Sequence, residues 1–158
     1  MADRTFTPQA EYGPLAAPAS LRHRRGAKAL VRSDDRVLLV RERHADGSVF
    51  WTLPGGGVEP TESLRGGLQR ELVEELGCDS VVSDRCGSFQ YAHRSKPGVV
   101  STYTVYETWL LDEPTPNVRQ GVTDYRWVEP RAPPSGTLPG VVGVLAEMPE
   151  SHSTRGVE

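Results

Sequence analysis

The chain has 158 residues, which is enough for one domain with a hydrophobic core of its own. Its 18 basic and 21 acidic side chains give a net charge of −3, which argues against a nucleic-acid polymer as the main partner. No apolar run approaches the roughly 18 residues of a membrane-spanning helix, and the first residues lack the apolar core of a signal peptide. Two cysteines, Cys78 and Cys86, have no metal-binding spacing and suit a reducing compartment. We therefore expect a cytoplasmic protein that does not enter a membrane.

The first part of the chain predicts a flexible arm and then a set of strands. Residues 1–20 contain three prolines and little periodicity, which is typical of a mobile segment. Residues 21–25 are mostly basic; such a cluster is more often a solvated strand entry than a phosphate contact. Short apolar and β-branched runs, with a turn at Ser33-Asp34-Asp35, then predict strands at 26–31, 36–43 and 50–53.

A helix is predicted from residue 64 to residue 76. Its apolar side chains recur every four residues, which makes a stripe suited to packing on a sheet: Leu64, Leu68, Leu72 and Leu76. Thr61 or Ser63 is suited to cap the start, and Gly77 suits a left-handed stop. Gly66 and Gly67 lie inside the helix, where each costs about 0.8–1.0 kcal/mol relative to Ala. Either another backbone packs very close to them, or the helix is less stable than its ends suggest.

The rest of the chain predicts more strands, a second helix and a frayed tail. Strand-like runs lie at 81–82, 88–93, 99–111 and 125–128. Residues 138–148 are apolar enough for a packing helix, although Pro139, Gly140 and Gly143 weaken it. This order predicts an α/β fold with a mixed central sheet between helices. We expect one domain over residues 21–149 and a frayed C-terminal tail over 150–158.

Three carboxylates make the helix chemically unusual. Glu71, Glu74 and Glu75 are three and four residues apart, so a helix gathers them on one flank beside the leucine stripe. Holding that much negative charge together is unfavourable without a cation. All-oxygen ligands favour Mg²⁺, Mn²⁺ or Ca²⁺ over Zn²⁺, and magnesium commonly shares its coordination with substrate phosphates. The glycine run from Gly55 to Gly57 lets backbone approach the ligand closely. The pattern predicts a hard divalent cation and a phosphorylated substrate.

The same segment resembles the Nudix hydrolase signature, G-x5-E-x7-R-E-U-x-E-E-x-G-U, where U is an aliphatic residue. Eight specified positions match at the required spacing: Gly56, Glu62, Arg70, Glu71, Leu72, Glu74, Glu75 and Gly77. The final aliphatic position is Cys78, a mild departure because buried cysteine behaves as a small hydrophobe.

The resemblance implies an α/β/α sandwich that hydrolyses a pyrophosphate bond in a nucleoside di- or triphosphate derivative. It implies Mg²⁺ as cofactor, with Mn²⁺ as a substitute. The implied metal ligands are three carboxylates and one backbone carbonyl: Glu71, Glu74, Glu75 and Gly55. By the same resemblance, Arg70 would hold a neighbouring carboxylate through a bidentate pair, and Glu62 would support the geometry of the loop and helix.

The general base stays open among three carboxylates. Many family members carry a further glutamate before the strand whose tryptophan aligns with Trp127. Here that loop, residues 117–124, holds a single carboxylate, Asp124, which is at least as readily a turn residue before a strand. The candidates are therefore Glu71, Glu75 and Asp124.

Candidate substrate contacts are aromatic and basic side chains. Aromatic faces accept any nucleobase, although each of these residues is more often part of a core: Phe50, Trp51, Tyr91 and Tyr103. Arginines are candidates for phosphate contacts, with plain surface charge the commoner role: Arg41, Arg43 and Arg94. No residue pattern selects one nucleotide.

Two other classes of function, and a homodimer, stay open at this stage. One class is a module that senses a nucleotide without turnover, and the other is an isomerase or other metal-dependent enzyme on the same scaffold. The sensing module is disfavoured because members that abandon catalysis commonly lose signature carboxylates, and all of them are present here.

Overall fold

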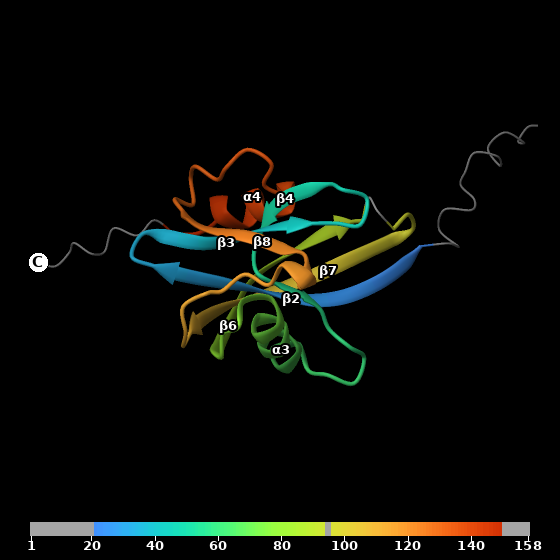
Figure 1. Ribbon diagram of the computed structural model, residues 1–158, viewed down its shortest axis with the longest axis horizontal. Coiled ribbons are helices and arrows are strands. Elements are labelled where there is room, and N and C mark those ends of the chain that lie inside the picture. The colour runs from blue at the N-terminus through green and yellow to red at the C-terminus, as the bar shows by residue number, and fades with distance from the viewer. Residues whose placement is uncertain (1–20, 94–95, 150–158) are drawn as a thin grey trace, which may run out of the picture.

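In residues 21–93 and 96–149, which are those that the computed structural model describes, seven strands form one mixed sheet with a helix on each side (Figure 1). The strand order is β4-β3-β2-β7-β6, with β5 paired to β2 and β8 paired to β3. The predicted α/β/α sandwich is confirmed. The predicted arm at 1–20, the tail at 150–158 and Arg94 lie outside the described residues.

The strands, helices and one 3₁₀ turn follow one another in this order: β2 (Arg22–Ser33), β3 (Arg36–Arg43), β4 (Val49–Thr52), β5 (Gly55–Gly57), α3 (Leu64–Leu76), β6 (Ser80–Ala92), β7 (Val99–Leu110), η1 (Val118–Gln120), β8 (Val122–Val128) and α4 (Pro139–Ala146). No helix in this described part of the chain is long and apolar enough to cross a membrane.

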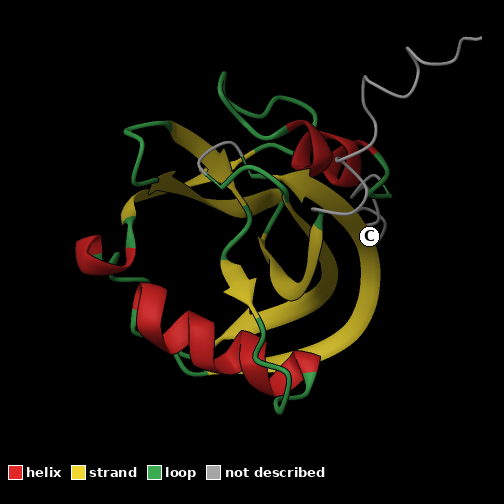
Figure 2. Ribbon diagram, turned by 90° about the vertical axis from the view of Figure 1, so that its right-hand side faces the viewer, coloured by secondary structure: helices red, strands yellow, loops and turns green. Residues whose placement is uncertain are grey.

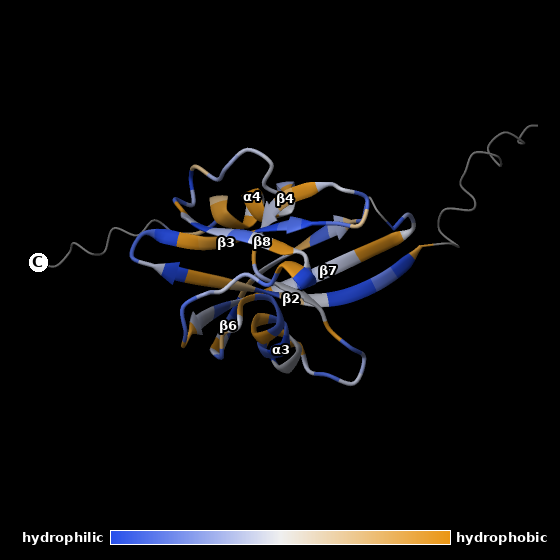
Figure 3. Cartoon of the chain, in the orientation of Figure 1, coloured by the Kyte–Doolittle hydropathy of each residue, from blue (hydrophilic) through white to orange (hydrophobic). Residues whose placement is uncertain are grey.

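Strand β2 joins the two parts of the sheet. It runs parallel to β7 from Arg22 to Val31, while its middle pairs antiparallel with β5 and its end with β3. Its first four residues are exposed and its next six are buried, and Figure 3 shows the same change from hydrophilic to hydrophobic. The basic cluster at 21–25 is therefore an exposed strand entry, and the apolar part of the strand passes through the core.

The two helices cover different sides of the sheet, as Figure 2 also shows. Three leucines of α3 are fully buried against β2 and β3 side chains: Leu68, Leu72 and Leu76. On the other side, Val141 and Leu145 of α4 are fully buried with Leu30 and Leu39. Burying each such side chain stabilises the fold by about 1.5–3 kcal/mol.

Helix α3 has the predicted ends. Ser63 is the N-cap, and its Oγ accepts a hydrogen bond from the Gly66 N–H at 2.9 Å. Gly77 ends the helix with φ of 68°, and its N–H is hydrogen bonded to the carbonyls of the last turn. The reason for a glycine inside the helix differs from the one we expected: at Gly67 a side chain, not a backbone, packs close. A Cβ built there would lie 2.7 Å from a methyl carbon of Val58.

Helix α3 also reaches the sheet edge. Arg65 donates to the Ser83 carbonyl at 2.9 and 3.2 Å, and Gln69 donates to the Ser80 carbonyl at 3.2 Å. Both acceptors belong to β6, the last strand in the order.

Two strand predictions need correction. The runs predicted separately at 81–82 and 88–93 belong to one strand, β6, which stays paired with β7 through register shifts near Arg85. Such bulges hide the period-2 pattern on which the prediction depended. Asp124 lies inside β8 opposite Arg41, where we had weighed it as a turn residue before the strand.

We predict opposite effects for two glycine-to-alanine changes. Gly67→Ala should lower the free energy of unfolding by up to about 2 kcal/mol, because the clash with Val58 exceeds the helix propensity gained. Gly143→Ala in α4, where no atom lies within 4 Å of the added Cβ, should raise it by up to about 1 kcal/mol. Urea unfolding of both variants checks this. Equal stabilisation by both would show that Val58 moves aside freely.

Candidate active site

The guanidinium of Arg70 binds three carboxylates and a backbone carbonyl. It forms a bidentate pair with Glu62, with Nε–Oε2 at 2.6 Å and Nη2–Oε1 at 2.9 Å. Its Nη1 lies 3.1 Å from Glu71 and 3.2 Å from Glu74, and Nη2 donates to the Gly57 carbonyl at 3.2 Å. A single cation therefore connects three parts of the site. These are the loop before α3, the acidic flank of α3 (Glu71, Glu74 and Glu75) and the glycine strand β5 (Gly55–Gly57).

Glu62 fixes the loop that precedes α3. Besides the pair with Arg70, its Oε1 accepts the backbone N–H of Glu59 at 2.9 Å. The hydrogen bonds from Arg70, followed by the one from Glu59, lower the pKa of Glu62 from 4.5 to about 2. Arg25 reinforces the same loop by donating to the Glu62 carbonyl at 2.7 Å. The resemblance implied that Glu62 supports the loop and helix, and these hydrogen bonds to Arg70 and to the Glu59 N–H are contacts through which it can do so.

Glu75 is turned away from Arg70 into a second buried cluster. Its side chain accepts the Gly55 N–H at 3.0 Å. On the other side of that residue, the Lys28 ammonium donates to the Gly55 carbonyl at 2.8 Å. Lys28 also lies 3.7 Å from Glu42, and the Glu42 carboxylate lies 3.2 Å from Nε2 of His44. This cluster holds two acids and one permanent cation.

Burial and neighbouring charge shift the pKa values of this second cluster in different directions. For Glu75, burial and the charge of Glu42 outweigh the opposing effect of Lys28 and raise its pKa well above its usual range. For Glu42, burial acts in the same direction, but Lys28 and His44 outweigh it and lower the pKa. Burial opposes the charge on Lys28, yet the acids around it, Glu42 foremost, raise its pKa. Lys28 is therefore charged at neutral pH.

The glycine strand β5 makes room for a carboxylate and separates two cavities. A Cβ on Gly56 would lie 2.8 Å from an oxygen of Glu71, so only glycine lets this carboxylate approach the strand. Glu71 lines a cavity of about 460 Å³ together with His23, Arg24 and Gly57. Glu75 lines another of about 320 Å³ that also includes Lys28, Glu42, Lys96 and Tyr103.

The donors fit a hard divalent cation by their chemistry. Carboxylates of Glu71, Glu74 and Glu75 and the carbonyl of Gly55 are all oxygen ligands, and Gly56 supplies the space that Glu71 needs. Among residues 21–93 and 96–149, however, no three acidic, histidine or cysteine side chains are arranged around one point. Arg70 and Lys28 hold these oxygens instead, so a metal would compete with two side-chain cations.

A basic rim faces the acidic flank. The Arg24 guanidinium lies against Gly57, where an added Cβ would come within 2.8 Å of its Nη2. Arg24 lines the cavity that includes Glu71, and Lys96 lines the cavity that includes Glu75. Burial and the charges of Arg24 and Lys96 lower the pKa of the nearby His93. A polyanion between the rim and the carboxylates would meet positive charge on one side and metal-binding oxygens on the other.

The predicted aromatic contacts divide into two groups. Phe50 and Tyr91 lie together, with ring centroids 5.6 Å apart, and His44 is 4.6 Å from Phe50. Phe50 and Tyr91 line a cavity of about 510 Å³. Trp51 is only 8% exposed, belongs to the core beneath α4 and is covered by Arg126.

The structure does not bring Arg41 and Asp124 to the acidic flank. They are cross-strand partners, and Arg41 also pairs with Trp51, so all three side chains share one face of the sheet. Glu42 follows Arg41 and points to the other face, toward Lys28. Of the three candidate bases, only Glu71 and Glu75 adjoin the cavities of the site.

Three charged residues of the site were not among the candidates: Lys28, Glu42 and Lys96. Arg24 belongs to the basic cluster at 21–25, for which a phosphate contact was the rarer of the two roles considered. Lys28 is a lone charge inside an otherwise apolar strand, and such residues are rarely buried unless paired. A charged residue in an apolar strand was therefore the sequence feature that could have identified Lys28 as part of the site. Glu42 stands between two arginines in the sequence, which conceals its burial.

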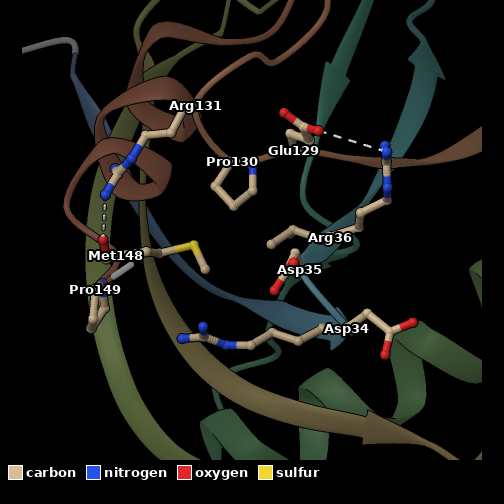
Figure 4. A pocket seen from close by; sticks show the side chains of 10 residues that line it. Asp34, Asp35, Arg36, Glu129, Pro130, Arg131, Met148 and Pro149 are labelled. Carbon is tan, nitrogen blue, oxygen red and sulfur yellow. Dashed lines mark hydrogen bonds and ion pairs between the residues drawn. The ribbon is translucent and has the colours of Figure 1, made fainter. Parts of the chain in front are cut away.

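A further cavity of about 320 Å³ lies away from the acidic flank, between the β2–β3 turn and the residues around α4 (Figure 4). Arginines that line this cavity contact groups of the protein itself. Arg131 donates to the carbonyls of Ala146 and Met148 at 2.7 and 3.0 Å, and Arg36 lies 3.7 Å from Glu129. The hydrogen bonds from Arg131 stabilise the end of α4.

A family model described as "NUDIX domain" matches residues 22–143, which is more than half of the chain. The chain belongs to the Nudix family. The resemblance drawn from the signature is thereby confirmed, as is the prediction that the chain is an enzyme of this family. In this Nudix protein, Cys78 at the last signature position is fully buried, and burial raises the pKa of its thiol to about 11.

Similar proteins include enzymes and solved structures of the family. CTP pyrophosphohydrolase of Escherichia coli strain K12 is 41% identical over 63 residues, covering 39% of this chain and about half, 47%, of that protein. Nucleoside triphosphatase NudI of Escherichia coli O1:K1 is 30% identical over 112 residues, which cover 64% of this chain and 78% of that protein. The crystal structure of a MutT Nudix hydrolase from Burkholderia pseudomallei superposes with a TM-score of 0.69 at 21% identity, covering 81% and 99%. The last match supports the fold alone.

We predict that the Glu62–Arg70 pair stabilises the protein only above acidic pH. Because the folded-state pKa of Glu62 is depressed to about 2, its contribution is complete above 4.5 and is lost as pH falls toward about 2. The stability difference between wild type and Glu62→Gln should therefore shrink on acidification. Urea unfolding in a double-mutant cycle with Arg70→Met measures the coupling. A coupling that does not change with pH would contradict the assignment.

Proposed function

We propose that this protein hydrolyses a pyrophosphate bond in a nucleoside di- or triphosphate derivative, with Mg²⁺ as cofactor and Mn²⁺ as a substitute. The observation that carries the proposal is the acidic flank of α3, Glu71, Glu74 and Glu75, held beside the glycine strand β5. Two similar proteins are named for CTP and nucleoside triphosphates, which supports a nucleotide as the substrate class.

The metal would draw on the oxygens of Glu71 and Glu74, and Glu75 and the Gly55 carbonyl would join this donor set only where Lys28 releases that carbonyl. When bound, it supplies positive charge that neutralises the diphosphate and stabilises the leaving oxygen. Arg70 makes its shortest contacts with Glu62, at 2.6 and 2.9 Å, and longer ones with Glu71 and Glu74. It can therefore release those two carboxylates and still anchor the helix to the loop.

Glu75 is suited to accept a proton from the attacking water. It is 6% exposed and lines the cavity that also includes Lys28 and Glu42, so its carboxylate adjoins the site while it is shielded from bulk solvent. The Gly55 N–H, 3.0 Å away, fixes the orientation of the side chain. Glu71, on the other side of β5, is the second candidate.

The rest of the substrate would be held by basic and aromatic side chains. Arg24 and Lys96 on the basic rim suit the phosphates, since both line cavities that open on the site. Phe50 and Tyr91 suit a nucleobase, because their rings lie together beside a cavity large enough for one. The cytoplasmic location and the homodimer stay predictions from the sequence.

The direct test is a panel of nucleoside di- and triphosphates and their conjugates, assayed for phosphate or pyrophosphate release with Mg²⁺ or Mn²⁺. Turnover should require the metal and disappear with EDTA. The far-UV circular dichroism should not change, because Arg70 balances Glu71 and Glu74, and Lys28 balances Glu42, without a metal. Saturable binding without product would favour the sensing module instead. Loss of the fold with EDTA would mean that the metal is structural.

Glu75→Gln tests the proposed base. The change removes the proton acceptor while keeping the side-chain shape, so turnover should fall by about 10²–10⁴. Asp124→Asn is the matched control, because this carboxylate lies on the opposite face of the sheet and its loss should leave turnover near wild type. Glu75→Gln activity within about threefold of wild type would overturn the assignment, and Glu71→Gln would then be the variant to compare.

A further inference from the structure

Lys28 is the most unusual charged residue in the described part of the chain. Its residue exposure is 3%, in the middle of strand β2, between the fully buried Ala27 and Ala29. Its ammonium donates to the Gly55 carbonyl at 2.8 Å, lies 3.7 Å from Glu42 and stands 4.8 Å from the centre of the Tyr103 ring. Every contact that the structure gives this ammonium is to a negative or electron-rich group.

The position of this ammonium is one that a divalent cation would otherwise suit. Around it are a carbonyl oxygen and the Glu42 carboxylate, and the Gly55 N–H leads on to Glu75. Oxygen donors of this kind are the ones that hard cations prefer. Two cations that share one carbonyl oxygen repel each other, so the ammonium and a metal ion exclude each other there.

We propose that Lys28 is a built-in cation at the Gly55 carbonyl, so that the site needs one divalent ion fewer than its oxygen donors would accommodate. The inference rests on the proposed metal-dependent function and refines it. Metal binding is then concentrated on the side of Glu71 and Glu74, where the donor oxygens contact the Arg70 guanidinium at 3.1 and 3.2 Å. On the other side of β5, Lys28 positions Gly55, and through the Gly55 N–H it positions Glu75. Lys28 is a positioning residue, since it acts on the reaction through these two groups.

The test counts Mn²⁺ ions bound per chain by electron paramagnetic resonance of the free ion, in the full-length protein. Lys28→Met removes the ammonium and keeps the length of the side chain, so this variant should bind an additional Mn²⁺. Its melting temperature should also rise with Mn²⁺ by more than that of wild type, because the ion takes the place of the lost charge. Lys28→Arg keeps the charge and should bind as many ions as wild type.

Two further variants keep the result decisive. Lys28→Met leaves the Glu42 carboxylate buried without its cation, which can prevent folding. Where it does, Mn²⁺ should restore the fold, because the ion takes the place of the lost ammonium beside Glu42. The double variant Lys28→Met/Glu42→Gln lacks both the ammonium and the Glu42 carboxylate, so it should fold without Mn²⁺ and gain no ion. Lys96→Met is the matched control, because Lys96 lines the same cavity but is exposed, and it should bind as many ions as wild type.

The outcomes separate this inference from the proposed function. If Lys28→Met binds no more Mn²⁺ than wild type, or stays unfolded in Mn²⁺ while the double variant folds, Lys28 does not occupy a cation position and the inference fails alone. If Lys96→Met gains an ion as well, the effect is one of overall charge and the inference also fails. If wild type binds no Mn²⁺ at all, both the inference and the metal-dependent function are overturned.

Discussion

The repulsion between carboxylates on one turn of α3 is the constraint on which the site depends. Glu71 and Glu74 face Arg70, and Glu75 faces away toward the Gly55 N–H and the neighbourhood of Lys28. Like charges this close destabilise a helix unless cations or hydrogen bonds balance them. The chain balances them with its own side chains, so the acidic flank is formed before any substrate arrives.

This balance requires a particular path of the backbone. Strand β2 carries Lys28 and Arg25, strand β5 carries the glycines, and α3 carries the acids; all three elements meet because β5 pairs with the middle of β2. Glycine is needed at Gly56 because any side chain would displace the Glu71 carboxylate. It is needed at Gly55 because φ of 125° and the close backbone of Ala27 exclude other residues. The fold and the site are therefore specified by the same three-residue strand.

The local features of the structure follow from the sequence because their causes are local. The leucine period, the Ser63 cap and the Gly77 stop are all set within one helix, and spacing along that helix also fixes Arg70, Glu71, Glu74 and Glu75. The cluster of Lys28, Glu42 and Gly55 could not be predicted in this way. Its members are far apart in the chain and meet only after the strands pair, so spacing carries no trace of their contact. The same holds for Asp124 and Arg41, whose side of the sheet is set by register.

The contacts of Arg65 and Gln69 with strand β6 have a consequence for self-association. A strand at the end of a sheet presents free backbone groups that another molecule can pair with, which is a common route to aggregation. Here two of those carbonyls, at Ser80 and Ser83, already accept side-chain hydrogen bonds from α3. One helix thus does two things: its inner face supplies the acids and leucines, and its outer polar residues protect the border of the sheet against intermolecular strand addition.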